Sequence, residues 1–227
     1  MRCADASIRN LGIVASLAAI LGAKVWLIAL FAVEMPIWDQ WSGEALGAYL
    51  PYLQGKLSLA NVIAFHSEHR IAFTRALGLA LLILNGSWDP ILGMLVDCLL
   101  HLVAIFLILR LVRPVLGLGD FLLYAGFVAL LFATPFGWSN TLSAFQVQFY
   151  ALVLLVLLSL YFLHDAPAWS TAWWVGTAFG ILSYFTSASG ALTLSAFVAL
   201  ALLQLALGRR SGIREILAIL VHIAITI

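Results

Sequence analysis

The sequence predicts an all-α, polytopic membrane protein: a single bundle of about six or seven spanning helices over residues 1–227, with extracytoplasmic juxtamembrane helices after the first span. Three observations predict it. The chain is 64% hydrophobic, its mean hydropathy is +1.11, and only 9% of its residues are charged. A water-soluble domain of 227 residues could not bury that much apolar surface, so most of it must face lipid.

Charge and cysteine content exclude other classes of protein. The net charge is only +1, so no nucleic-acid partner is expected from bulk electrostatic attraction. Cys3 and Cys98 lie far apart in the sequence, and this spacing suggests neither a disulfide framework nor a metal knuckle.

The spans are placed by runs of about 20 mostly apolar residues. The first covers about 11–33 and is expected to be an uncleaved anchor, because it is long and lacks a small-residue cleavage site. Further spans are predicted at about 91–109, 121–136, 142–163, 173–187 and 191–207. A seventh begins near Glu215 and is still apolar at Ile227, so we expect this sequence to be the N-terminal part of a longer protein.

The segment 71–84 decides the topology, because it is apolar, only 14 residues long and contains Arg75. If it spanned the membrane, Arg110 and Arg113 would lie on the side opposite to Arg9. If it lies at the membrane surface, seven of the eleven basic residues share the cytoplasmic side: Arg2, Arg9, Arg110, Arg113, Arg209, Arg210 and Arg214. The positive-inside rule favours the second arrangement.

This topology places the N-terminus in the cytoplasm and the protein in the cell (inner) membrane. Residues 34–90 then form one long extracytoplasmic element, with two short amphipathic helices interrupted by Pro51 and Gly55. The polar loops 137–149 and 184–190 face the same side. The turn at 187–190 joins two rather short helices, so it is expected to sit below the membrane surface, against protein or a watery cavity.

Two carboxylates follow the first span, Glu34 and Asp39. A carboxylate near the hydrocarbon boundary can act as a general base or bind a metal, so both are candidate catalytic residues. The alternative is a solvated cap for the span.

The stretch "FHSEHRIAF" gathers His66, Glu68, His69 and Arg70 within five positions. Arg70 offers a bidentate fork suited to phosphate, both histidines could add hydrogen bonds to a substrate, and Glu68 is a further candidate catalytic carboxylate. His66, Glu68 and His69 could also ligate a divalent metal, although their spacing matches no recognised metal motif. The alternative is a polar loop whose side chains reach the lipid headgroups.

Ionisable groups inside spans are costly and usually paired. Lys24 and Asp97 fall at matching depths on antiparallel spans, which predicts a Lys24–Asp97 pair with His101 one turn below. Asn140 and Gln146 lie where the fourth span begins and are candidate ligands for sugar hydroxyls, with helix capping and interhelical bonding as the alternative.

The order of these features resembles the GT-C glycosyltransferases, multispan enzymes that take sugars from polyprenyl-phosphate donors. An acidic residue follows the first span, two juxtamembrane helices come next, and a polar, basic motif leads into the following span. The segments "FHSEHRIAFTRALGLALLILNGSWDP", "WSNTLSAFQVQFY" and "SYFTSASG" also look like an uncharacterised bacterial membrane-protein family of this type.

The resemblance implies that Asp39 is the catalytic base and that Arg70, together with Arg75, contacts the donor phosphate. The chain departs from the superfamily pattern in two places, because Glu34 and Asp39 are not adjacent and "HSEHR" stands where a Lys-Pro-Pro or His-Pro-Pro element is common. The expected function is transfer of a sugar from a polyprenyl-phosphate donor to an extracytoplasmic acceptor, with the lipid bilayer and the lipid-linked sugar as partners. A transporter or flippase of a lipid-linked substrate, or a non-catalytic assembly subunit, are the alternatives.

Overall fold

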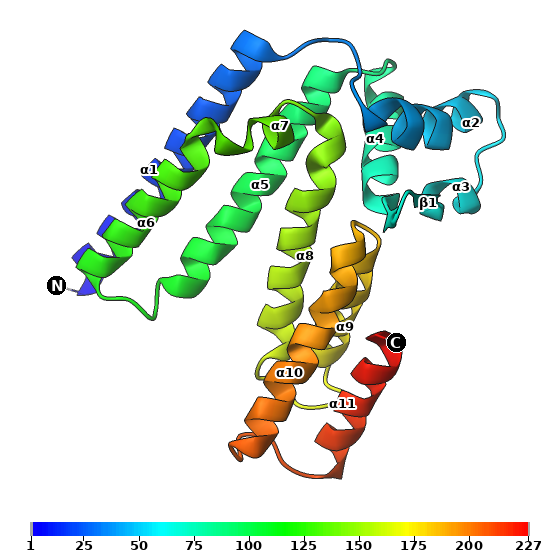
Figure 1. Ribbon diagram of the computed structural model, residues 1–227. Helices are drawn as coiled ribbons and strands as arrows, with labels where there is room; N and C mark the ends of the chain where they lie inside the picture. Colours follow the sequence, from blue (N-terminus) through cyan, green and yellow to red (C-terminus); the bar gives the residue numbers. More distant parts are fainter. Residues whose placement is uncertain (1, 227) are drawn as a thin grey trace.

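The computed structural model describes the backbone of residues 2–226 and the side chains of residues 4–226, so the predictions for the side chains of Arg2 and Cys3 lie outside the described part. The chain is an all-α bundle whose one sheet in that part is a two-stranded hairpin (Figure 1). The seven longest α-helices outside the 34–90 element are α1 (Arg2–Phe31), α5 (Pro90–Val112), α6 (Leu118–Ala133), α8 (Val147–Leu163), α9 (Thr171–Tyr184), α10 (Leu192–Ala206) and α11 (Ile213–Thr226).

Within residues 2–226, five segments are long and apolar enough to cross a membrane: Ala4–Phe31, Pro90–Val112, Leu118–Thr141, Ala144–Leu163 and Ala188–Ala206. Five of the predicted spans correspond to these segments. The predicted span at 173–187 corresponds to α9, which has 14 residues, or about 21 Å at 1.5 Å per residue, less than the thickness of the hydrocarbon core of a bilayer. The predicted seventh span corresponds to α11, which is described as far as Thr226.

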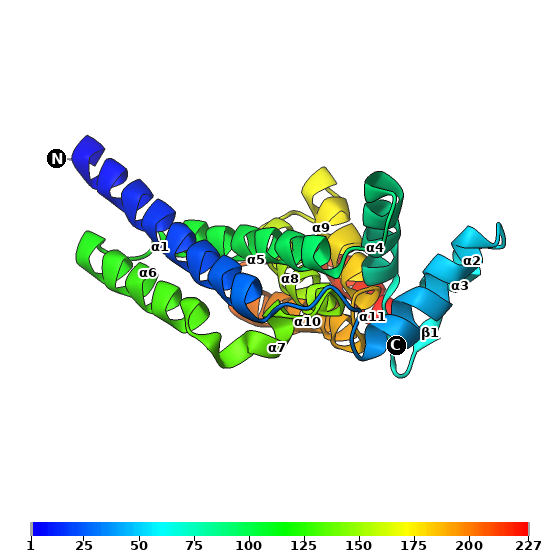
Figure 2. The ribbon, with the colours of Figure 1, turned by 90° about the horizontal axis from the view of Figure 1, so that it is seen from above.

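The helices form two packed groups (Figures 1 and 2). In one, α1 and α6 lie side by side and pack on α5 through Ile20, Ile105 and Phe121, all fully buried. In the other, α9, α10 and α11 share a core that includes Trp173 and Phe197. The helix α8 joins the groups, because it contacts both α5 and α9.

Basic residues from the start of α1 and the end of α5 lie together. Arg9 donates a hydrogen bond to the carbonyl oxygen of Arg113 over 2.8 Å, and Arg113 donates to the amide oxygen of Asn10 over 2.7 Å. The end of α10, which precedes Arg209 and Arg210, lies lower in Figure 1 than these two helix ends.

The chain leaves α1 and enters α5 at the opposite end, and the residues between form a folded element. It contains a π-helix η1 (Gln40–Tyr49), α2 (Leu50–Leu53), α3 (Leu59–Ile63), the strands β1 (Phe65–His66) and β2 (His69–Arg70), and α4 (Ala72–Asn85). The first two run on as one helical stretch, and Pro51 lies at their junction, in the first turn of α2. Gly55, with a φ of +66°, follows the end of that stretch, so only the glycine interrupts it as predicted.

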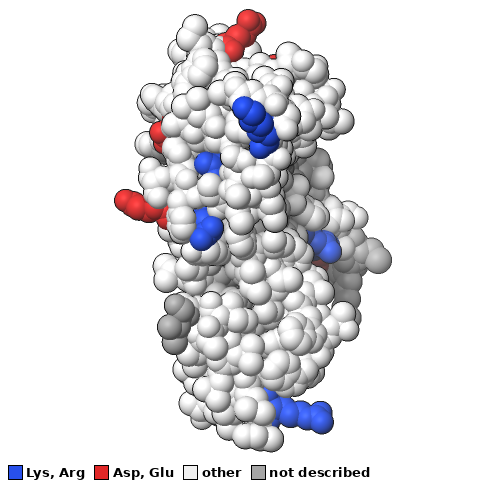
Figure 3. Space-filling model, turned by 90° about the vertical axis from the view of Figure 1, so that its right-hand side faces the viewer, with Lys and Arg blue, Asp and Glu red and all other residues white. Residues whose placement is uncertain are grey.

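The helix α4 differs in direction from the predicted surface helix. It has 14 residues, too few to cross a bilayer, but it stands beside the upper part of α8 and α5 instead of lying across the end of the bundle (Figure 1). Gly86, at a φ of +74°, ends it, and Asp89 then caps α5 by accepting a hydrogen bond from the N–H of Leu92 over 3.0 Å. Figure 3 shows that charged side chains are few on the face that this element and α11 present.

Short helical turns connect the long helices. Three precede α8: η2 (Pro135–Gly137), α7 (Trp138–Thr141) and η3 (Ala144–Gln146). The turn η4 (Ala188–Ala191) joins α9 to α10 and lies well below the level at which α1 ends and α5 begins (Figure 1).

Candidate functional site

The motif "FHSEHR" folds as a β-hairpin that divides its side chains between two faces. Phe65 pairs with Arg70 and His66 with His69, and Ser67 takes a positive φ of +52° at the turn. Directly opposed residues share a face of an antiparallel pair, so Phe65 and Arg70 project together. The guanidinium carbon of Arg70 lies 4.0 Å from the centroid of the Phe65 ring, a cation–π contact.

The hairpin brings His66 to Asp39. The Nε2 atom of His66 is 3.8 Å from Oδ1 of Asp39, which lies just ahead of η1. The carboxylate side chain of Asp39 is 64% exposed, whereas the imidazole of His66 is only 15% exposed and lies edge-on to Phe145. A held imidazole beside an accessible carboxylate is an arrangement suited to moving protons.

The same hairpin contacts the loop between α9 and α10. The Nδ1 atom of His69 accepts a hydrogen bond from the backbone N–H of Ala188 over 3.2 Å, and Arg70 lies 5.9 Å from the centroid of Tyr184. The structure therefore gathers three segments that are distant in sequence. We call Asp39, His66, His69 and Arg70 the hairpin site.

The other predicted site residues lie apart from this cluster or at its rim. Glu68 is exposed at the hairpin tip, and Glu34 is exposed in the link that follows α1. Gln146 is half-buried in η3, and its Oε1 atom has no hydrogen-bond partner in the described structure. Asn140 is in α7 and lines a different cavity.

Arg75, predicted to contact a donor phosphate, is buried, with only 3% of its surface exposed. Its Nε–H donates to the carbonyl oxygen of Gly43 over 2.8 Å, and its Nη1 donates to the carbonyl oxygens of Asn61, Val62 and Ala64 over 2.6 to 3.3 Å. These bonds hold η1 and α3 to α4. Arg75 thus positions the hairpin from beneath, with Nε and Nη1 already committed to the backbone.

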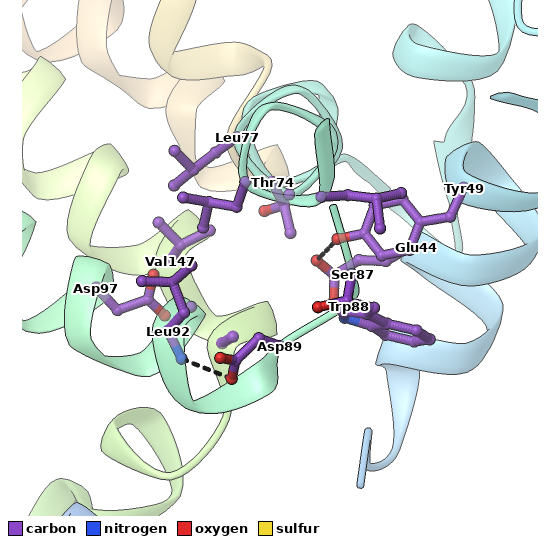
Figure 4. Close-up of a pocket in the computed structure, with 15 residues that line it drawn as sticks. Glu44, Tyr49, Thr74, Leu77, Ser87, Trp88, Asp89, Leu92, Asp97 and Val147 are labelled. Carbon is purple, nitrogen blue, oxygen red and sulfur yellow. Dashed lines mark hydrogen bonds between the residues drawn. The ribbon is translucent and has the colours of Figure 1, made fainter. Parts of the chain in front are cut away.

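Glu44 is a buried carboxylate beneath the hairpin site that the sequence analysis did not single out. It is 3% exposed, and its Oε1 accepts a hydrogen bond from the hydroxyl of Tyr49 over 2.8 Å (Figure 4). Burial raises its pKa to about 7, against the lowering effect of hydrogen bonds from Tyr49 and Gln40. The available signal was spacing, since Gln40, Glu44 and Ala48 recur every four residues and so share the buried face of η1.

A small polar cavity of about 20 Å³, enough for one water molecule, separates Glu44 from Asp97 of α5 (Figure 4). Thr74 lines it between them. One oxygen atom of each residue is buried without a hydrogen-bond partner in the described structure: Oε2 of Glu44, Oδ2 of Asp97 and Oγ1 of Thr74. Two acids and a hydroxyl around one water-sized space can exchange a proton through it.

The predicted Lys24–Asp97 pair is not formed. The Nζ of Lys24 donates to the hydroxyl of Thr141 over 2.8 Å and to that of Tyr150 over 3.3 Å, and no ion pair within 4 Å joins it to Asp97. Lys24 and Asp97 line two different cavities, and the count of residues from each helix end did not specify which way each side chain turns.

Among the described residues, no group of three or more His, Cys, Asp or Glu side chains is placed to hold a metal ion. His66, Glu68 and His69 therefore do not form the metal site that their sequence left open as an alternative. No family model, curated protein or solved structure matches the chain, so its function has to be inferred from its own geometry.

Proposed function

We propose that this protein is a membrane glycosyltransferase of the GT-C type, which moves a sugar from a polyprenyl-phosphate donor to an extracytoplasmic acceptor. The observation that carries the proposal is the meeting of Asp39 and His66 at 3.8 Å beside one face of the hairpin, whose other face presents Arg70. A base and a phosphate-binding cation are the two groups that this reaction needs from the protein.

Asp39 deprotonates the acceptor hydroxyl, which attacks the anomeric carbon in line with the leaving lipid phosphate. It suits this role because its carboxylate is exposed and holds no strong ion pair. His66 orients Asp39 and relays the proton.

Arg70 balances the charge that grows on the lipid phosphate. The guanidinium has five N–H donors, of which Nη1 donates to the carbonyl oxygen of Ile63 over 3.0 Å. The remaining donors have no partner among the described residues, which leaves a fork for phosphate. His69 holds the loop between α9 and α10 beside the site, the exposed carboxylate of Glu68 at the hairpin tip is free to contact the acceptor, and the apolar helices accommodate the lipid tail.

A proton-coupled transporter of a lipid-linked substrate is the second candidate. Glu44 and Asp97 favour it, because two acids that face one water-sized cavity at the edge of a membrane bundle are a feature of proton relays.

Asp39→Asn tests the first candidate. In proteoliposomes supplied with a panel of polyprenyl-phosphate sugars, transfer should fall at least a hundredfold, because the amide cannot accept the proton. Asp120→Asn, which changes an exposed carboxylate in the first turn of α6, is the matched control and should retain full transfer.

Transfer that persists in Asp39→Asn would exclude this carboxylate as the base. Substrate-dependent proton uptake that Glu44→Gln abolishes and Asp39→Asn leaves intact would favour the transporter.

A further inference from the structure

A second cavity lies among the helices, away from the hairpin site. It has a volume of about 510 Å³ and is walled by α1, α5, α6 and α8, with η2 and α7 at one end. This volume is within the range of small-molecule sites in proteins. None of the four residues of the hairpin site lines it.

The wall of this cavity is mostly apolar, and Thr134 and Asn140 add polar groups near η2 and α7. Four further polar residues that line it are each at least nine-tenths buried: Lys24, His101, Thr141 and Tyr150. The ring of His101 stacks on Tyr150 at a centroid distance of 4.5 Å, and its Nδ1 atom has no hydrogen-bond partner in the described part of the chain.

Lys24 gives the cavity its charge. It is the only charged residue that lines it, and none of the lining residues is acidic. Its ammonium has three N–H donors, of which the hydroxyls of Thr141 and Tyr150 accept two. Among the side chains of residues 4–226, only these two hydroxyls accept hydrogen bonds from Lys24, and Nδ1 of His101 is buried without a hydrogen-bond partner.

The cavity also reaches the surface that faces lipid. Trp26, Phe31 and Phe136 line it and are each more than 60% exposed on the outside of the bundle. An apolar chain can therefore enter from the bilayer and fill the space between Leu27, Ile105 and Val153 without passing through water.

From this charge complementarity we propose that the cavity binds a single-chain amphiphile whose head is an oxyanion, a carboxylate or a phosphate monoester. The head accepts hydrogen bonds from Lys24 and contacts Tyr150 and His101, and the chain lies along the apolar wall. The inference does not depend on the proposed transfer reaction, because the two sites share no residue.

The test compares anions with alcohols of the same chain on the purified full chain in non-ionic detergent. Oleate is paired with oleyl alcohol, and farnesyl phosphate with farnesol, and the affinities are measured by native mass spectrometry. At least one anion should bind tenfold or more tightly than its alcohol, a difference of about 1.4 kcal/mol. Which anion shows the preference identifies the head as carboxylate or phosphate.

Lys24→Met should reduce the affinity for that anion at least tenfold and leave the affinity for the alcohol unchanged. The chain offers a matched control, because its only other lysine, Lys56, is exposed in the loop before α3, and Lys56→Met should change neither affinity. Tyr150→Phe, which removes one hydrogen-bond partner of Lys24, should lower the affinity for the anion about threefold.

Equal affinities for anion and alcohol in the unaltered protein would overturn the proposal, and that comparison needs no variant to fold. A preference that survives Lys24→Met, or that Lys56→Met removes equally, would also overturn it.

Discussion

The hairpin site and the buried cluster around Arg75 each contain an arginine, and the two arginines have opposite roles. Arg70, on the hairpin, is half-exposed, and one of its nitrogens donates to one carbonyl oxygen. Arg75, five residues later, is buried and donates to four carbonyl oxygens, one in η1 and three in α3 and its C-cap residue Ala64. We call the buried cluster of Gly43, Glu44, Tyr49 and Arg75 the anchor.

The difference shows that whether an arginine can bind a ligand depends on how many of its N–H donors lack a partner in the protein, and not on its charge alone. The Nε and Nη1 groups of Arg75 donate to backbone carbonyl oxygens, so replacing Arg75 should destabilise the fold. Arg70 retains donors for a ligand, and replacing it should change function with little effect on stability. Each prediction below tests this division between the hairpin site and the anchor.

The largest effect is expected from Arg75→Met. It removes the donors of one buried carbonyl oxygen in η1 and of three part-buried ones in α3 and its C-cap, so the free energy of unfolding should fall by about 4 kcal/mol. Arg70→Met, the matched change on the hairpin, loses one part-buried hydrogen bond and a cation–π contact and should cost about 1 kcal/mol. Chemical denaturation in detergent measures both free energies of unfolding. Equal losses in the two variants would contradict the division between a structural Arg75 and a ligand-binding Arg70.

The next effect concerns pH and Glu44. Its pKa is about 7 in the folded protein and 4.5 ordinarily, so between these values the folded state keeps a proton that the unfolded state releases. The free energy of unfolding should therefore decline as pH rises from 4.5 to 7, by about 3 kcal/mol, and level off above.

Glu44→Gln should remove this decline and make the protein more stable than the original at pH 8. Glu68→Gln changes a glutamate at the exposed hairpin tip and should keep the decline. Thermal unfolding in detergent between pH 5 and pH 8 measures both. If the stability of Glu44→Gln declined with pH as steeply as that of the original protein, a group other than Glu44 would be responsible for the decline.

The smallest effect is expected from Gly47→Ala. A Cβ atom there would lie 2.8 Å from Nε of Arg75, so the guanidinium must shift off its carbonyl partners, at a cost of about 2 kcal/mol. Gly22→Ala in α1 is the control, because a Cβ there meets nothing within 4 Å and alanine favours the helix. If both variants unfold at the same temperature, the packing of the anchor is looser than described.

The hairpin site could be expected from the sequence in outline. Rare polar residues in an apolar chain pointed to His66, His69, Arg70 and Asp39, and the distribution of arginines placed their loops at one end. The details of pairing could not be expected, because depth along a helix does not specify its rotation. Lys24 therefore bonds to Thr141 and Tyr150, far along the chain.

Composition and apolar run length alone determined that this chain is a helical bundle with helices long enough to cross a membrane, because a backbone in lipid must satisfy its own hydrogen bonds. Only the tertiary structure decided that Arg75 is an anchor, that Glu44 is buried and that Lys24 faces a cavity. Those outcomes depend on which face each helix turns inward, and that is settled by packing against segments distant in the sequence.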